Sequence, residues 1–225
     1  MMGEQTVTES ALRQAIITAC LQMNASGINQ GTSGNISVRF EDSMLITPSG
    51  ISYEALKPDL ICRVLLQKGE EPQWQGPLKP SSEWRFHRDI LLTRAEVNAV
   101  VHLHPPFCTA LAINRRSIPA CHYMIAAFGG VDVRCADYAL FGTEALSQHV
   151  LLALQERTAC LMANHGMIAM GGSLEKALWR SVELEALAQQ YTLALQTGTP
   201  VLLSDKEIAA ALQQFAGYGL QRSAK

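Results

Sequence analysis

The 225-residue chain has the length of one large domain rather than of two domains of average size. Hydrophobic residues make up 48% of it and charged residues 17%, a composition that excludes disordered and fibrous proteins. The 18 Lys and Arg residues nearly balance the 20 Asp and Glu residues, giving a formal net charge of −2. Because no broad basic field results, binding to nucleic acid or to a membrane surface is not expected. We expect a single domain over residues 1–225.

The six cysteines are widely spaced and include no C-x-x-C pair, which argues against a zinc ribbon or a dithiol redox motif. They look like small buried hydrophobic residues. The N-terminus has no cationic segment ahead of an apolar one, and no apolar run has the length of a membrane-spanning helix. A reduced compartment, the cytoplasm, is the expected location.

The N-terminal part of the chain changes from a helical period to a strand period. Apolar residues at three- and four-residue steps predict a first helix, with Thr8 or Ser10 as its cap and Gly27 as its terminator. Gly, Pro and charged residues predict a long surface loop at 68–80, followed by a helix-start signal at 81–83. The other elements expected here are strands at 35–40, 44–47 and 60–67 and a helix at 83–92.

The C-terminal part alternates strands and helices. A capping box at 204–207 opens a final helix toward Phe215. The other expected elements are strands at 97–104, 131–135, 158–163 and 167–170 and helices at 107–114, 143–156 and 173–195. Because this order lacks a regular βαβ rhythm and a G-x-G-x-x-G turn, it does not support a nucleotide-binding doubly wound fold. We expect an α/β fold with a mixed, largely antiparallel sheet covered by helices.

Two histidines, His102 and His104, stand at the end of a predicted strand. Residues i and i+2 of a strand share a face, so the two rings converge about 7 Å apart along the backbone and can share a metal. Pro105 and Pro106 end the strand and place both rings at a rim that a substrate can reach. For this H-x-H pair alone, two partly buried structural histidines fit equally well.

His165 follows another apolar strand and sits in a turn beside Gly166. Taken alone, it fits a turn histidine without function as well as it fits a ligand. Together with His102 and His104 it favours a metal, because three histidines from two strand ends fit a catalytic zinc site with an open position. Four Cys or His ligands would have indicated a structural site.

Glu83 stands at a predicted helix start behind Ser81 and Ser82. An ordinary first-turn glutamate, stabilised by the helix dipole, is the commoner reason for such a residue. The two serines, however, supply hydroxyl and backbone N–H groups for an anion, and a glutamate beside bound phosphate and zinc could serve as a base. His87 lies one turn on, and we interpret it as a helix-face partner of Glu83 rather than as a ligand.

Two further loops, 29–35 and 47–50, combine glycines with Asn, Ser and Thr and could form anion nests. Ordinary turns explain such residues more often. Three loops of this kind beside a zinc site nevertheless suggest a small phosphorylated substrate.

Six motifs stand in a fixed order along the chain: N-Q-G-T-S-G-N-I-S-V-R, L-I-T-P-S-G, P-S-S-E-W-R-F-H, V-V-H-L-H, H-Y-M-I-A-A and N-H-G-M-I-A. In this order, over about residues 12–219, the sequence resembles the class II aldolase and adducin-head family. The resemblance implies an α/β/α sandwich with a mostly antiparallel central sheet, a cyclic homotetramer, and active sites between neighbouring subunits. It also implies that the C-terminal tail from about residue 205 is mobile.

The resemblance also assigns roles to residues. It implies zinc ligands at His102, His104 and His165, and it makes Glu83 the catalytic acid/base that also touches zinc in the resting enzyme. Tyr123 matches a tyrosine that reaches the adjacent subunit's site and protonates the aldehyde oxygen. The positions that match the family's phosphate-binding residues are Gly34, Asn35, Ser49, Gly50, Ser81 and Ser82, and those near its aldehyde pocket are Phe141, Phe215 and Tyr218.

The implied activity is a zinc-dependent, reversible cleavage of L-fuculose 1-phosphate, or a close ketose 1-phosphate, to dihydroxyacetone phosphate and L-lactaldehyde. Three rivals would use the same site: a 5-deoxypentulose-phosphate aldolase, a sugar-phosphate 4-epimerase, and a methylthioribulose-phosphate dehydratase. A non-catalytic, adducin-like interaction module is the rival from another class, and it would be expected to lack the zinc histidines.

Overall fold

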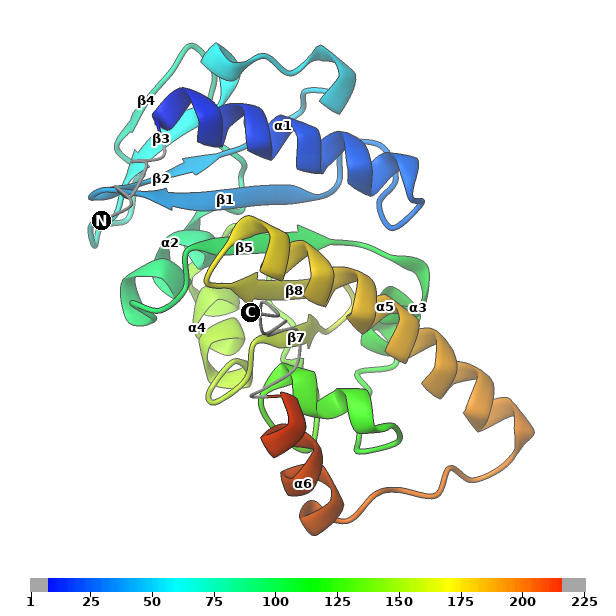
Figure 1. Cartoon of the computed structure of the whole chain (residues 1–225). Helices are drawn as coiled ribbons and strands as arrows, with labels where there is room; N and C mark the ends of the chain where they lie inside the picture. Colours follow the sequence, from blue (N-terminus) through cyan, green and yellow to red (C-terminus); the bar gives the residue numbers. More distant parts are fainter. Residues whose placement is uncertain (1–7, 216–225) are drawn as a thin grey trace, which may run out of the picture.

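The computed structural model describes residues 8–215, which form one eight-stranded sheet and the helices around it (Figure 1). The strand order is β4-β3-β2-β1-β5-β8-β7-β6, and every neighbouring pair is antiparallel except β6 with β7. The strands are β1 Asn35–Phe40, β2 Ser43–Ile46, β3 Cys62–Leu65, β4 Trp74–Gln75, β5 Ala99–Leu103, β6 Cys135–Ala136, β7 Ala159–Met162 and β8 Gly166–Gly171. The α-helices are α1 Glu9–Ala25, α2 Trp84–Thr93, α3 Pro106–Ile113, α4 Glu144–Ala153, α5 Leu174–Thr197 and α6 Asp205–Phe215, and the 3-10 helices are η1 Tyr53–Ala55, η2 Pro58–Leu60 and η3 Tyr123–Phe128.

Helices cover both faces of the sheet, which confirms the expected α/β/α sandwich with a mostly antiparallel sheet. Because alternate strand residues point to opposite faces, the buried side chains divide into two clusters. Val101 and Leu103 of β5 pack with α1, α3 and α5, whereas Val100, two residues before His102, packs with α2 and α4. His102 therefore points to the face that α2 covers.

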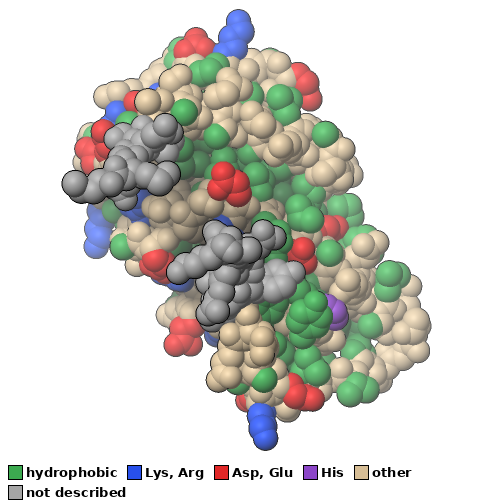
Figure 2. Space-filling view, in the orientation of Figure 1, with side chains coloured by type: hydrophobic (Ala, Val, Ile, Leu, Met, Phe, Trp, Pro, Cys, Tyr) green, Lys and Arg blue, Asp and Glu red, His purple; other side chains and the backbone are tan. Residues whose placement is uncertain are grey.

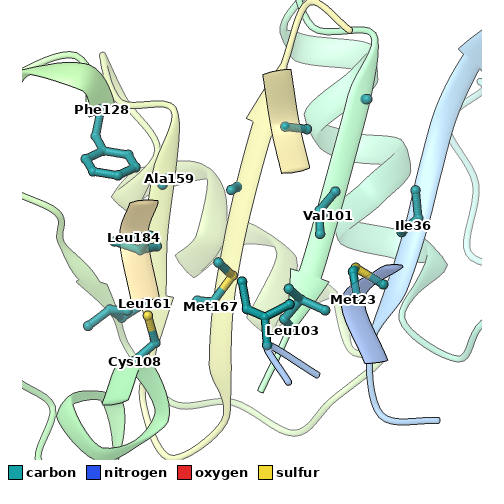
Figure 3. Packing of buried hydrophobic residues seen from close by; sticks show 14 of the residues in the cluster. Met23, Ile36, Val101, Leu103, Cys108, Phe128, Ala159, Leu161, Met167 and Leu184 are labelled. Atoms are coloured by element: carbon teal, nitrogen blue, oxygen red, sulfur yellow. The ribbon is translucent and has the colours of Figure 1, made fainter. Parts of the chain in front are cut away.

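Figure 3 shows the cluster on the α1 and α5 face. Met23 of α1 packs beside Ile36 and Leu103, and Leu184 of α5 lies over Leu161. All five side chains are at most 2% exposed. Burial of one such side chain stabilises the fold by roughly 1.5–3 kcal/mol, so this cluster fixes β5, the strand that carries His102.

The first and last helices begin at the predicted caps. Thr8 accepts a hydrogen bond from the N–H of Ala11 at 3.3 Å, and the Ser204 and Glu207 side chains exchange the capping-box bonds that open α6. Ile208 of α6 is fully buried and α6 packs against η3. The described part of the tail, up to Phe215, is thus a packed helix.

Some elements differ from the sequence-based expectation. The third strand is shorter than 60–67, because Pro58 starts a 3-10 helix that runs to Leu60. The expected strand at 131–135 is wrong as a single element: Val133 only bridges Ile118, and β6 begins at Cys135. The loop at 68–80 contains the short edge strand β4, and η3 had no predicted counterpart.

The surface agrees with the balanced composition. In Figure 2 the Lys and Arg side chains are scattered around the edge of the visible face rather than gathered into a patch. No helix among residues 8–215 is long and apolar enough to cross a membrane.

Candidate active site

The turn between β7 and β8 places His165 against the end of β5. Asn164 has a left-handed backbone, with φ of 53°, and turns the chain into β8. Gly166 then passes so close to β5 that a Cβ there would lie 2.4 Å from the carbonyl oxygen of Leu103 and 2.5 Å from Cδ2 of His104. Only glycine permits this approach, which brings His165 beside His104.

The three predicted histidines converge on one point. Their ligand atoms lie within 4.8 Å of one another, and Nε2 of His102 is 2.9 Å from Nε2 of His104. Glu83 completes the group: its Oε2 is 3.1 Å from Nε2 of His102 and its Oε1 is 3.0 Å from Nε2 of His165. The structure therefore brings together all four residues expected at the metal.

The hydrogen bonds around this group fit a bound cation. His102 donates a hydrogen bond from Nδ1 to the carbonyl oxygen of Met167 at 2.8 Å, so the Nε2 of the neutral ring presents a lone pair to the centre. Within residues 8–215, Oε1 of Glu83 is a buried oxygen that accepts no hydrogen bond. Three imidazoles and one carboxylate aimed at a single point are the donor set of a divalent metal such as zinc.

Burial and charge act in opposite directions on Glu83, whose side chain is only 8% exposed. Burial alone would raise the pKa of Glu83, but its interactions with His102 and His165 outweigh burial and hold that pKa well below its usual range. For His104, burial followed by repulsion from His102 and His165 lowers the pKa to about 4. At neutral pH the centre thus offers an ionised carboxylate and a neutral His104.

A pocket of about 390 Å³ opens beside the metal-site residues. Glu83, His104 and His165 line one side of it. All six residues expected at the substrate phosphate also line it: Gly34, Asn35, Ser49, Gly50, Ser81 and Ser82. Its described lining contains no Lys or Arg, so an anion there would be held by hydroxyls, amides and the N-terminal end of α2.

Two of the pocket loops are tied together by backbone hydrogen bonds. The N–H of Ser81 donates to the carbonyl oxygen of Thr47 at 3.0 Å, and the N–H of Ser49 donates to that of Lys79 at 3.1 Å. Gly50 completes the first loop with φ of 72°, a conformation that favours glycine. The loops after β2 and before α2 therefore form one rigid wall of the pocket.

Asn35 connects the pocket to the metal site. It stands directly opposite His102 in the pairing of β1 with β5, and its Nδ2 donates to Oε2 of Glu83 at 2.8 Å. His87 is not in direct hydrogen-bond contact with Glu83, in contrast to its interpretation as a helix-face partner. It reaches Glu83 through Asn35, which its Nε2 contacts.

Within one chain, the described residues expected near the aldehyde line two different pockets. Phe141 is exposed and lines the pocket beside the metal site. Tyr123 and Phe215 instead line another pocket, of about 720 Å³, where their stacked rings lie 6.3 Å apart. Tyr218 lies outside the described residues.

Sequence reasoning did not single out Tyr138 and Asn164, which also line the first pocket. For Asn164, its place next to His165 in the chain was an available signal. For Tyr138 the sequence offered no such signal, because this residue stands in an irregular segment between β6 and α4.

Comparison with known proteins gives this centre a context. Residues 14–192 match the family model described as class II aldolase and adducin N-terminal domain. The chain is 52% identical over 212 residues to the L-fuculose phosphate aldolase of Escherichia coli K12, covering 93% of this chain and 96% of that protein. It is 50% identical over 209 residues to the 5-methylthioribulose-1-phosphate/5-deoxyribulose-1-phosphate aldolase of Rhodospirillum rubrum, covering 93% of each.

Solved structures of aldolases share the fold of this chain. An L-fuculose 1-phosphate aldolase structure superposes with a TM-score of 0.88 at 35% identity, covering 95% of this chain and 100% of that one. The l-fuculose-1-phosphate aldolase of Thermus thermophilus gives a TM-score of 0.72 at 27% identity, covering 86% of this chain and 100% of that one.

A three-histidine, one-glutamate centre on an α/β/α sandwich defines a metal-dependent enzyme. The chain belongs to the class II aldolase and adducin family, and its match to the aldolases over nearly its full length makes it an aldehyde-lyase of that family.

Proposed function

We propose that the protein is a zinc-dependent aldolase that reversibly cleaves L-fuculose 1-phosphate to dihydroxyacetone phosphate and L-lactaldehyde. The observation that carries this proposal is the convergence of His102, His104, His165 and Glu83 at the edge of a phosphate-type pocket. The 52% identity to the Escherichia coli L-fuculose phosphate aldolase supports the choice of substrate.

In this proposal the pocket loops hold the substrate phosphate. The hydroxyls of Ser49, Ser81 and Ser82 and the amide of Asn35 are among the polar groups on its walls. They orient the sugar so that its carbonyl and the neighbouring hydroxyl lie beside the three histidines. A metal bound by these histidines supplies Lewis-acid polarisation of those oxygens.

In this proposal Glu83 and Tyr123 donate and accept the protons of the reaction. In cleavage, the tyrosinate form of Tyr123 of a neighbouring subunit takes the proton of the C4 hydroxyl, the C3–C4 bond breaks, and its electron pair remains on C3. The protonated form of Glu83 then delivers its proton to C3, which gives dihydroxyacetone phosphate and leaves Glu83 ionised. Proton exchange with water returns a proton to Glu83 and removes one from Tyr123 before the next cleavage. In condensation the same groups act in reverse: Glu83 takes the C3 proton and Tyr123 protonates the aldehyde oxygen.

The position of Tyr123 supports an assembled enzyme. Tyr123 is 55% exposed and does not line the pocket of its own chain, so in this proposal it serves a site on another chain. A cyclic homotetramer with sites between neighbouring subunits meets this requirement, with Phe141, Phe215 and Tyr218 near the aldehyde. We place this enzyme in the cytoplasm, where its small phosphorylated substrate is retained.

A 5-deoxypentulose-phosphate or methylthioribulose-phosphate aldolase is the second candidate. The relative of Rhodospirillum rubrum with that name is 50% identical, nearly as similar as the first. The 4-epimerase and the dehydratase would use the same metal and phosphate sites. An adducin-like module would not need the intact histidine centre.

The test is the release of dihydroxyacetone phosphate by purified protein from L-fuculose 1-phosphate, measured before chelation, after chelation and after zinc is restored. Parallel assays use 5-deoxyribulose 1-phosphate and 5-methylthioribulose 1-phosphate. A kcat/KM that is highest for L-fuculose 1-phosphate and depends on zinc supports the proposal. Higher kcat/KM for either other ester moves the assignment to the second candidate, and no release by zinc-loaded protein rejects the aldolase reaction.

A further inference from the structure

A buried chain of polar side chains leads from β1 through α2 to the candidate acid/base. It runs from Ser37 to His87, from His87 to Asn35, and from Asn35 to Glu83. Ser37 and His87 have no solvent exposure, and Asn35 and Glu83 have 5% and 6%. A buried polar chain of this kind is costly unless every member is hydrogen-bonded.

The carboxylate at one end of this chain fixes the direction of every hydrogen bond in it. A carboxylate only accepts, so Asn35 must present its Nδ2 to Oε2 of Glu83, at 2.8 Å. The amide oxygen of Asn35 then faces His87, whose Nε2 must carry the proton that it donates. Nδ1 of His87 is left as the acceptor for the hydroxyl of Ser37, at 2.8 Å.

The surroundings of His87 support the neutral ring that this direction requires. Burial, followed by repulsion from His102, lowers the pKa of His87 to about 3, against an opposing effect of Glu83. The ring also stacks on Phe86, with centroids 4.8 Å apart. His87 is therefore held in one position and in one tautomer.

The orientation of the Asn35 amide matters because its two ends have opposite effects on Glu83. With Nδ2 toward Glu83 it donates a hydrogen bond to Oε2. With Oδ1 there instead, two acceptor oxygens would face each other in a buried site. The amide ends are nearly equal in shape, so the carboxylate of Glu83 on one side of Asn35 and the donor on its far side together determine the orientation.

We propose that His87 is a positioning residue: it fixes the amide of Asn35 so that Oε2 of Glu83 is held for proton transfer and Oε1 is directed to the metal site. The hydroxyl of Ser37 donates to Nδ1 of His87 and so satisfies the second ring nitrogen of this tautomer. This inference rests on the proposed role of Glu83 as acid/base.

The kinetic test compares His87→Ala, His87→Gln and Ser37→Ala with a matched control, Ser147→Ala. Ser147 is also fully buried and also donates to a side chain of α2, Asp89 at 2.6 Å, but it has no link to the site. We expect His87→Ala to lower kcat about 10- to 100-fold at unchanged zinc content, as loss of partners behind metal-site residues typically does. We expect a smaller loss for Ser37→Ala and none for Ser147→Ala.

His87→Gln tests whether turnover can be rescued, because a glutamine amide can still donate a hydrogen bond to Oδ1 of Asn35. It should recover most of the turnover that His87→Ala loses. Unchanged kcat in His87→Ala, or equal losses in Ser37→Ala and Ser147→Ala, would overturn the proposal. If His87→Ala does not yield folded protein, Ser37→Ala and His87→Gln carry the comparison.

A second readout does not need turnover. In ¹⁵N-histidine-labelled wild-type protein loaded with zinc, the signal that disappears in His87→Gln should show a protonated Nε2 and a bare Nδ1, and Ser37→Ala should perturb that signal. A proton on Nδ1 would overturn the inference. If no ketose phosphate is cleaved at all, the proposed function fails, while this tautomer measurement still decides how His87 orients Asn35.

Discussion

Gly166 and Leu103 approach so closely that a methyl group on Gly166 would lie 2.4 Å from the carbonyl oxygen of Leu103. The contact is with backbone, which cannot swing aside, so the turn that carries His165 must move if Gly166 gains a side chain.

We therefore expect Gly166→Ala to lose zinc affinity and turnover together. Gly172→Ala, just beyond the other end of β8, is the control, because a Cβ there meets only Glu96 at an ordinary 3.5 Å. Zinc content by elemental analysis and the rate of dihydroxyacetone phosphate release measure the two effects. Equal zinc content and rate in the two variants would contradict this account of the turn.

Glu83→Gln should keep zinc and lose most of its turnover. The substitution preserves shape and the possibility of a metal contact through Oε1, but it removes the group that moves the proton. General acid–base catalysis contributes about 10²- to 10⁴-fold, so a loss of that size in kcat is expected. Glu144→Gln, in the first turn of α4 and exposed to solvent, is the matched control. Unchanged kcat in Glu83→Gln would remove Glu83 from the role of acid/base.

Chelation should destabilise the folded protein, and zinc should restore its stability. Zinc bound by the folded site but not by the unfolded chain adds about 2.7 kcal/mol when free zinc is 100 times Kd. Thermal unfolding before chelation, after chelation and after zinc addition measures this shift, with His165→Ala as the control that should respond weakly. If neither chelation nor zinc addition changes the unfolding temperature, this result would argue against a metal in this site.

The stability of metal-free protein should fall below neutral pH, in part because of His87. Its pKa is lowered from 6.5 to about 3 in the folded state, so between these values the unfolded chain binds a proton that the folded chain does not. Stability therefore rises with pH through this window and is lost as pH falls. At pH 5 the loss from His87 is about 2 kcal/mol relative to neutral pH. Urea unfolding at pH 5 and pH 7 should show a smaller difference for His87→Gln, and an equal difference would contradict the burial of a neutral His87.

Mixed assemblies can test whether Tyr123 serves a neighbouring site. Tyr123→Phe and Glu83→Gln should each be nearly inactive alone. When the two are unfolded, mixed in equal amounts and refolded together, a site is intact only if its own subunit retains Glu83 and its neighbour retains Tyr123. Random cyclic assembly makes about one quarter of the sites intact. Activity no higher than that of the separate variants would place Tyr123 outside the neighbouring site.

The sequence allowed much of this site to be predicted, because strand alternation and chain order define it. The i and i+2 spacing of His102 and His104 is enough to place both rings on one face of a strand. The chain of Ser37, His87 and Asn35 could not be derived in that way, since it joins two elements whose separation in space depends on sheet packing. Periodicity also missed η3, because a single 3-10 segment repeats no pattern long enough to read.

The pairing of Asn35 with His102 has a consequence for selectivity. One residue borders the anion pocket and the other belongs to the metal site, and they are direct partners across adjacent strands. In the proposed function, this pairing holds one of the groups beside the phosphoryl group at a fixed distance from the histidines beside which the carbonyl lies. We therefore expect a 1-phosphate of a 2-ketose to be cleaved with a higher kcat/KM than an isomer whose phosphoryl group is one carbon further from its carbonyl.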